Sequence, residues 1–261
     1  MSKPLPFSIS IICHNEKSRL EKVLQSIAGL AEDVVIVDSG STDGTIELAK
    51  TYTKRVMHRD WEGYGQQKVF AEQQCTFDWI LNLDADEILL GEVKANIRKV
   101  FEVDEEKRAA AYSLRFCNVS SLAKSLKPHP LAPVNVTPRL YNRKKAGFND
   151  SAVHDKVVTY DGSKPKVLAG DVAHISFKSF GHVWEKTQFY AELQAEDWYK
   201  KGRNPGWLRL MFDPPTFFFK QYFLRRFCFL GLEGLVISLI LAAGRVLRIG
   251  LTMEKCRKNS S

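Results

Sequence analysis

The chain has 261 residues, 44% of them hydrophobic, and a formal net charge of +8. Its length suits one large domain or one domain with an appendage, and its composition excludes a low-complexity chain. From Lys200 onward, 12 Lys and Arg stand against 3 Asp and Glu, a net +9, whereas residues 1–199 hold 26 against 27, a net −1. The basic character therefore belongs to the C-terminal region, where we expect an anionic partner.

Strand-like and helix-like segments alternate through the first ninety residues. Four apolar runs indicate strands, and the segments between them show helical periodicity. The strands are expected at 7–13, 34–37, 55–58 and 79–83, and the helices at 20–27, 46–49 and 66–74. Ser41 or Thr42 is expected to cap the second helix. This alternation predicts a parallel sheet covered by helices.

Polar residues follow these strands, at the sheet edge where such folds bind ligands. Asn15 and Asp38 come after the first two strands, and Asp84 and Asp86 after the fourth. Asp-x-Asp is a hard-oxygen motif suited to Mg2+ or Mn2+ that also holds phosphate oxygens. The alternative is that one aspartate caps a following helix. Neither the Gly-x-Gly-x-x-Gly nor the Walker phosphate loop occurs, so a metal is expected to screen bound phosphates.

Three motifs, at 10–16, 37–45 and 83–87, together resemble the family 2 inverting glycosyltransferases of GT-A fold. Shorter motifs at 63–68, 138–143, 153–155 and 173–176 are similar to bacterial lipopolysaccharide-core β-1,4-glucosyltransferases that act on inner-core heptose. The resemblance implies an α/β fold with a mostly parallel central sheet, helices on both faces and a helical C-terminal extension. We expect a catalytic domain over 1–200, with nucleotide-binding (1–90) and acceptor (91–200) parts, and the extension over 201–261.

The resemblance also assigns a donor site to the first two strand ends. It implies that Asp38 holds the uracil of a UDP-sugar, and that Ser39 and Ser41 hydrogen-bond the nucleotide. Asn15 and Glu16 stand where the family contacts the nucleoside. The alternatives are a turn aspartate for Asp38 and a first-turn glutamate, favoured by the helix dipole, for Glu16.

The metal ligands implied by the resemblance are Asp84, Asp86 and His174, for Mg2+ or Mn2+. For His174 the alternative is a structural histidine. An inverting transfer needs one base to deprotonate the acceptor hydroxyl, and the resemblance points to Asp155, beside a substrate-binding His154.

Two cationic residues, Lys68 and Arg139, are expected to contact phosphates, Arg139 those of the acceptor. Many such residues have no ligand, so the alternative is that neither binds substrate.

The tail combines apolar and basic residues. Aromatic side chains from Phe217 to Phe229 interleave with Lys and Arg, and an apolar run to Ala243 follows, interrupted by Glu233. This pattern favours an interfacial helix over a spanning one or a core helix, and it speaks against nucleic acid as partner.

Together these features predict transfer of a hexose, glucose in our interpretation, from a UDP-sugar to a heptose of lipid A-core, forming a β-linkage. The five scattered cysteines and the N-terminus suggest a cytoplasmic protein without signal peptide, bound peripherally to the inner membrane. The alternatives are another lipid-linked or cell-surface acceptor, or a non-catalytic protein that binds nucleotide sugars at the membrane.

Overall fold

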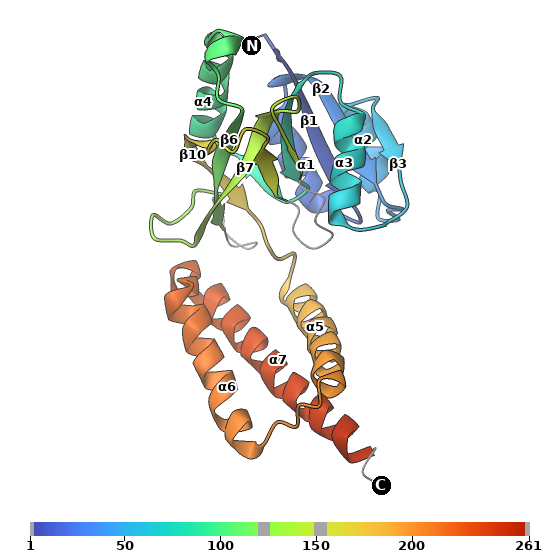
Figure 1. The fold of residues 1–261 in the computed structure, drawn as a ribbon, viewed down its shortest axis with the longest axis vertical. Helices are drawn as coiled ribbons and strands as arrows, with labels where there is room; N and C mark the ends of the chain where they lie inside the picture. Colours follow the sequence, from blue (N-terminus) through green and yellow to red (C-terminus); the bar gives the residue numbers. More distant parts are fainter. Residues whose placement is uncertain (1–2, 120–125, 149–155, 259–261) are drawn as a thin grey trace. The chain divides into compact units, whose positions relative to one another are not determined.

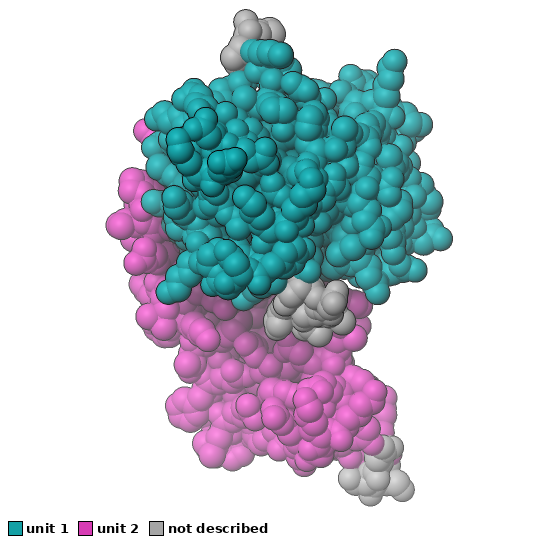
Figure 2. All heavy atoms as spheres, turned by 45° about the horizontal axis from the view of Figure 1, so that its top comes forward, with its two compact units in different colours: residues 1–117, 134–175 teal, residues 118–133, 176–261 magenta. Residues whose placement is uncertain are grey.

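A computed structural model describes residues 3–119, 126–148 and 156–258. The chain divides into two compact units, coloured separately in Figure 2. Unit 1 comprises Met1–Cys117 and Val134–Ile175, and unit 2 comprises Asn118–Pro133 and Ser176–Ser261. Each unit is described by itself.

The first half of unit 1 alternates strands and helices (Figure 1). Its β-branched and apolar runs form strands, and its segments of helical periodicity form helices, as predicted. The elements are β1 (Leu5–Cys13), α1 (Lys17–Ile27), β2 (Ala31–Asp38), α2 (Thr45–Tyr52), β3 (Val56–His58), α3 (Tyr64–Gln73) and β4 (Trp79–Asp84).

The second half of unit 1 is richer in strands. After β4 the chain forms a further short strand and one helix before the long strands that complete the sheet. These elements are β5 (Glu87–Leu89), α4 (Gly91–Glu102), the 3-10 turn η1 (Glu105–Lys107), β6 (Ala111–Asn118), β7 (Val134–Asn142), β8 (Ala146–Phe148), β9 (Val157–Thr159) and β10 (Lys166–His174).

One eight-stranded sheet, in the order β3-β2-β1-β4-β7-β6-β10-β5, organises unit 1. The strands β3, β2, β1 and β4 are parallel, whereas β7 pairs antiparallel with both β4 and β6, and β10 with β5. Helix α3 packs on β1, and α4 packs on β10. The predicted α/β class is confirmed; beyond β4 the described strand pairs are antiparallel, because β6 and β7 follow one another without a crossover helix.

Two local expectations are corrected. The N-cap of α2 is Gly44, in a left-handed conformation, and neither Ser41 nor Thr42 caps that helix. Asp84 and Asp86 do not begin a helix, because Ile88 and its neighbours pair with β10 as β5. Burial of that short apolar run against β10 outweighs the capping tendency of the aspartates.

Unit 2 is helical. Long helices α5 (Phe180–Lys200) and α6 (Trp207–Phe219) both pack on α7 (Gly231–Lys258). Between α6 and α7 lie a π-helical turn, η2 (Lys220–Leu224), and a 3-10 turn, η3 (Phe227–Leu230). The expected domain boundary at residue 200 is the last residue of α5. The compact units instead separate after Ile175, since α5 packs on α7.

Candidate functional site

The strand ends that carry the predicted polar residues lie side by side. The parallel register aligns Cys13 at the end of β1 with Asp38 at the end of β2, and Ile12 with Asp84 at the end of β4. Since β1 lies between β2 and β4, the two aspartates flank it at one edge of the sheet. In parallel sheets this edge is where ligands bind.

Asp38 organises the loop after β2. One of its oxygens accepts hydrogen bonds from the backbone N–H groups of Gly40 and Ser41, each at 2.8 Å, and the other accepts from the Ser41 hydroxyl. Only 2% of Asp38 is exposed. The carboxylate therefore has local donors that hold it fixed.

Asn15 joins this loop to the end of β1. Its backbone is left-handed, with φ of 52°, and its N–H donates to the Ser41 hydroxyl at 2.7 Å. Its side-chain carbonyl accepts from the N–H of Thr42 at 2.8 Å. Glu16, which follows, donates its N–H to the hydroxyl of Thr45 at 2.9 Å. These bonds fix the two loops against each other, while the carboxylate of Glu16 is bound by Arg19.

Asp84 is held between two cations. Its Oδ1 lies 3.1 Å from the Lys68 ammonium and its Oδ2 accepts from the Arg139 guanidinium at 2.8 Å. Arg139 also donates to Glu87 at 2.7 Å and to the Asn82 carbonyl at 2.8 Å. Arg139 and Lys68, predicted to contact phosphates, are thus buried and engaged by carboxylates, because three acidic groups at a strand end need compensation.

Glu87 has a defined role that sequence patterns left open. Only 3% of it is exposed, and its second oxygen accepts from the backbone N–H of Asp84 at 2.8 Å. Burial raises the pKa of Glu87 to about 7, and the charges of Asp84 and Asp86 reinforce this effect against that of Arg139. Burial acts in the same direction on Asp84, but Arg139 and Lys68 outweigh it and hold the pKa of Asp84 well below its usual range.

Asp86 has different neighbours. One oxygen accepts from Arg19 at 3.0 Å, and the other lies 3.5 Å from Nε2 of His174. Arg19 is buried and also donates to both oxygens of Glu16 and to the carbonyl of Ile175. Burial disfavours the charged imidazole, but the hydrogen bond and charge of Asp86 outweigh it and raise the pKa of His174. Arg19 was not predicted, since its contacts with Asp86 and Ile175 span distant parts of the sequence.

A divalent cation fits the Asp86–His174 pair. Carboxylate oxygen and imidazole nitrogen are ligands that Mn2+ accepts, and Mg2+ retains several waters at such sites. Within residues 3–119, 126–148 and 156–258, no three His, Cys, Asp or Glu side chains gather so as to hold an ion by themselves. The pair therefore suits an ion whose other ligands are phosphate oxygens and water, whereas both oxygens of Asp84 are engaged by Lys68 and Arg139.

The remaining predicted residues are placed as follows. Ser39 accepts a hydrogen bond from the Gln67 amide at 2.7 Å, which ties α3 to the Asp38 loop. His154 and Asp155 lie outside the residues that the structure describes. The structure thus brings together two groups of predicted residues. The loops after β1 and β2 hold Asn15, Glu16, Asp38, Ser39 and Ser41, and a set of ion pairs around the end of β4 joins Lys68, Asp84 and Arg139, and Asp86 with His174.

A parallel α/β half-sheet whose strand ends carry a fixed loop aspartate and a neutralised acidic cluster has its candidate site at the edge where such folds bind ligands. Residues 8–168 match Glycosyl transferase family 2, and the chain belongs to that family.

Curated relatives extend the match over nearly the whole chain. An uncharacterized glycosyltransferase of Rickettsia prowazekii (strain Madrid E) is 36% identical over 97% of this chain and 89% of its own length. The lipopolysaccharide core biosynthesis glycosyltransferase LpsC of Rhizobium meliloti (strain 1021) is 32% identical over 90% of this chain and 87% of its own. Among solved structures, S. aureus TarS 1-349 is a distant likeness, with a TM-score of 0.43 and 16% identity over 98% of this chain and 92% of that one.

Proposed function

We propose that this glycosyltransferase moves a hexose, glucose in the first instance, from a UDP-sugar to a heptose of the lipopolysaccharide core, with inversion to a β-linkage. The similarity to LpsC, whose name places it in lipopolysaccharide core biosynthesis, supports the acceptor class. The observation that carries the donor site is the alignment of Asp38 and Asp84 on either side of β1.

The residues divide the work between the two ends of the donor. Asp38, with Ser39 and Ser41, holds the uracil and ribose. Asp86 and His174 would hold Mg2+ or Mn2+, which would supply positive charge at the diphosphate. Lys68 and Arg139 act indirectly, since they keep Asp84 ionised at the edge of the site.

The bond-forming step requires one base on the acceptor side. The acceptor hydroxyl gives its proton to Asp155 as its oxygen attacks the anomeric carbon, and the bond from that carbon to the diphosphate breaks, releasing UDP. One displacement inverts the configuration, so the product is the β-glycoside. An NMR spectrum of the product that showed an α-linkage would exclude this mechanism.

Asp86→Asn is the direct test. The amide keeps the size of the carboxylate and removes its charge, so transfer from UDP-glucose to purified heptose-terminated core should fall at least about a hundredfold. Glu32→Gln removes an exposed carboxylate from the opposite end of β2 and should transfer at the wild-type rate. Equal rates for D86N and E32Q, with both variants folded, would refute the proposed site.

Donor and acceptor are identified separately. Hydrolysis of a panel of UDP-sugars, with and without Mg2+ or Mn2+, reports the donor and the metal. Mass spectrometry of core oligosaccharide from a deletion strain reports the acceptor, where we expect loss of one hexose. If the core is unchanged and a different glycolipid lacks a hexose, that glycolipid is the acceptor of the same transfer reaction.

We also propose that unit 2 associates with the inner leaflet. Large apolar side chains of α6 are exposed, including Trp207 at 67% and Phe212 at 62%, beside the basic Arg209. The segment Phe227–Lys258 is long and apolar enough to cross a membrane, although 39% of its most apolar window is buried and core helices also meet these criteria. Glu233 near its start is buried, which suits peripheral contact through α6 better than a span.

Co-sedimentation with anionic liposomes tests this association. Trp207→Ser/Phe212→Ser should reduce the bound fraction because it removes the side chains that insert. Retention of the wild-type bound fraction in that variant would contradict the assignment to α6.

A further inference from the structure

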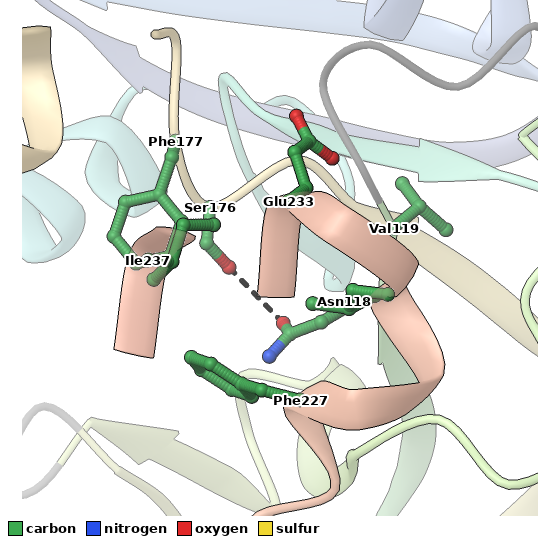
Figure 3. Close-up of a pocket in the computed structure, with 8 residues that line it drawn as sticks. Asn118, Val119, Ser176, Phe177, Phe227, Glu233 and Ile237 are labelled. Atoms are coloured by element: carbon green, nitrogen blue, oxygen red, sulfur yellow. Dashed lines mark hydrogen bonds between the residues drawn. The ribbon is translucent and has the colours of Figure 1, made fainter. Parts of the chain in front are cut away.

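Two hollows lined by described residues of unit 2 differ greatly in size. The smaller, of about 10 Å3, is lined by residues that include Asn118, Phe227 and Glu233 (Figure 3). The Ser176 hydroxyl donates to the Asn118 carbonyl across it at 3.0 Å. This space holds roughly one water. The larger cavity, of about 350 Å3, is bounded by α5, η2 and α7 and is of a size that accommodates an organic ligand.

The larger cavity has an apolar floor. Val183 and Ala191 of α5, with Phe227, are buried there, and the close approach of α5 to α7 depends on Gly244. A Cβ at residue 244 would lie 2.3 Å from the Thr187 methyl group, so a larger residue there requires the Thr187 side chain to move. Aliphatic and aromatic walls of this kind suit a hydrocarbon chain.

The rim of the cavity is cationic. Lys186 and Arg225 are exposed at it, and Arg245 stacks on Phe217 at 3.8 Å. None of the described residues that line the cavity carries a carboxylate. The nearby Asp213 is engaged by Arg248 at 2.5 Å. Burial lowers the pKa of Arg245, and Arg209 and Arg225 lower it further against the opposing charge of Asp213, so an anion at the rim would relieve repulsion among these cations.

Gln221 is a buried polar residue among those that line the cavity. It is 3% exposed, it lines the cavity, and its side-chain carbonyl has no donor within the described part of the chain. Gln221 belongs to the π-helical turn η2, a local distortion that is frequent at functional sites. An unpaired buried carbonyl costs free energy that a ligand hydroxyl would recover.

We propose that this cavity binds one molecule of an anionic, hydroxylated phospholipid: its phosphate lies at Lys186, Arg225 and Arg245, its headgroup hydroxyl donates to Gln221, and its acyl chain lies along the apolar floor. This site is distinct from the exposed face of α6. The proposal does not depend on which sugar unit 1 transfers. A lipid held here would fix unit 2 to the membrane by specific recognition in addition to general surface affinity.

The test uses the full chain and lipids that stay monomeric in water. Dihexanoyl phosphatidylglycerol should bind with a stoichiometry of one by calorimetry. Dihexanoyl phosphatidylcholine, which lacks the net negative charge, and inorganic phosphate, which lacks the acyl chains, should each bind at least about tenfold more weakly. Equal affinity for phosphatidylcholine, or equal affinity for free phosphate, would overturn the proposal.

Matched variants locate the site. K186Q/R225Q removes two exposed rim charges and should weaken phosphatidylglycerol binding about tenfold or more. R257Q/K258Q removes two exposed charges from the end of α7 and should bind as wild type. A191F fills the floor while retaining every cation and should abolish binding. If K186Q/R225Q and R257Q/K258Q lose affinity equally, the effect is one of net charge and the cavity is not the site.

Gln221→Leu separates headgroup recognition from folding. It should weaken phosphatidylglycerol binding and leave unchanged the binding of dihexanoyl phosphatidylmethanol, which has the same charge and no headgroup hydroxyl. An equal loss for both lipids would assign Gln221 a structural role only. These measurements involve no sugar transfer, and they use no bilayer, so their outcome is independent of both tests of the proposed function.

Discussion

Positive charge is arranged in opposite ways in the two units. In unit 1, Arg139 contacts both Asp84 and Glu87, and Arg19 contacts Asp86. In unit 2, Lys186, Arg225 and Arg245 meet at a cavity that no described carboxylate lines. Cations in the first case neutralise the protein's own acids, and in the second no carboxylate among the described lining residues does so. If the proposed lipid binds there, the same residue types serve internal order at one site and recognition at the other.

The largest expected effect is that of removing the cation shared by two acids in unit 1. Arg139→Ala leaves the buried Glu87 without its guanidinium partner and Asp84 with Lys68 alone. The free energy of unfolding should fall by about 3–5 kcal/mol in denaturant titrations, the cost of breaking a buried ion pair from one side. Exposed Lys99, replaced by Ala, should cost less than about 1 kcal/mol.

A second substitution sharpens that result. In the Arg139→Ala background the pKa of Glu87 should rise further, because Arg139 no longer lowers it, and the acid must take up a proton to stay buried. Glu87→Gln needs no proton and should therefore restore part of the stability. If E87Q lowers the stability of R139A further, burial of charge is not the origin of the loss.

A buried arginine in unit 2 provides the contrast. Arg248 donates to Asp213 and Gln194 and stacks on Trp198 at 3.9 Å. Since the side chain of Asp213 is 27% exposed, water can solvate it after Arg248→Ala. Unfolding should therefore cost about 1–3 kcal/mol less than in the wild type, a smaller loss than for R139A. If R248A loses as much stability as R139A, solvent exposure of the remaining carboxylate does not reduce the cost of removing its arginine.

The His174–Asp86 pair predicts a dependence on pH. The pKa of His174 is raised above its ordinary value of 6.5, so the pair's contribution to stability is complete below that value and is lost as pH rises through the raised pKa. The melting temperature of the wild type should exceed that of His174→Gln at about pH 6, and the difference should shrink by about pH 9. A difference that grows with pH would reverse the assigned sign.

The smallest effect concerns the thiols. Burial, together with the charge of Asp33, raises the pKa of Cys75 to about 12, and burial with Asp38 raises the pKa of Cys13 well above its usual range. Cys228 and Cys256 are half-buried and are expected to react first with Ellman's reagent. Rapid reaction of Cys13 or Cys75 in the folded protein would show that the core around these thiols opens readily.

The first ninety residues were predictable because their signals are local. Alternating strand and helix patterns specify a parallel sheet, and parallel strands bring Asp38 and Asp84 to one edge wherever they stand in the sequence. The positions of Arg19, 67 residues before Asp86, and of Arg139, 55 residues after Asp84, follow from packing alone. No local pattern marks a cation as the partner of a distant carboxylate.

The limits of sequence reasoning are clearest in unit 2. Its apolar and basic composition was evident, but the cavity depends on the approach of α5 to α7 at Gly244 and on the π-helical turn that contains Gln221. Both are consequences of helix packing. Likewise, the C-terminal charge excess starts near Lys200, whereas the helical unit already includes α5.

Unit 2 is assembled from two separate parts of the chain, Asn118–Pro133 and the segment from Ser176 onward. The backbone therefore passes between the units three times, at residues 117–118, 133–134 and 175–176. A module joined to a catalytic domain by one end can be gained, exchanged or lost in a single genetic fusion. This helical unit cannot, because its inner segment is encoded within the gene region for unit 1, so the two units are expected to be inherited together.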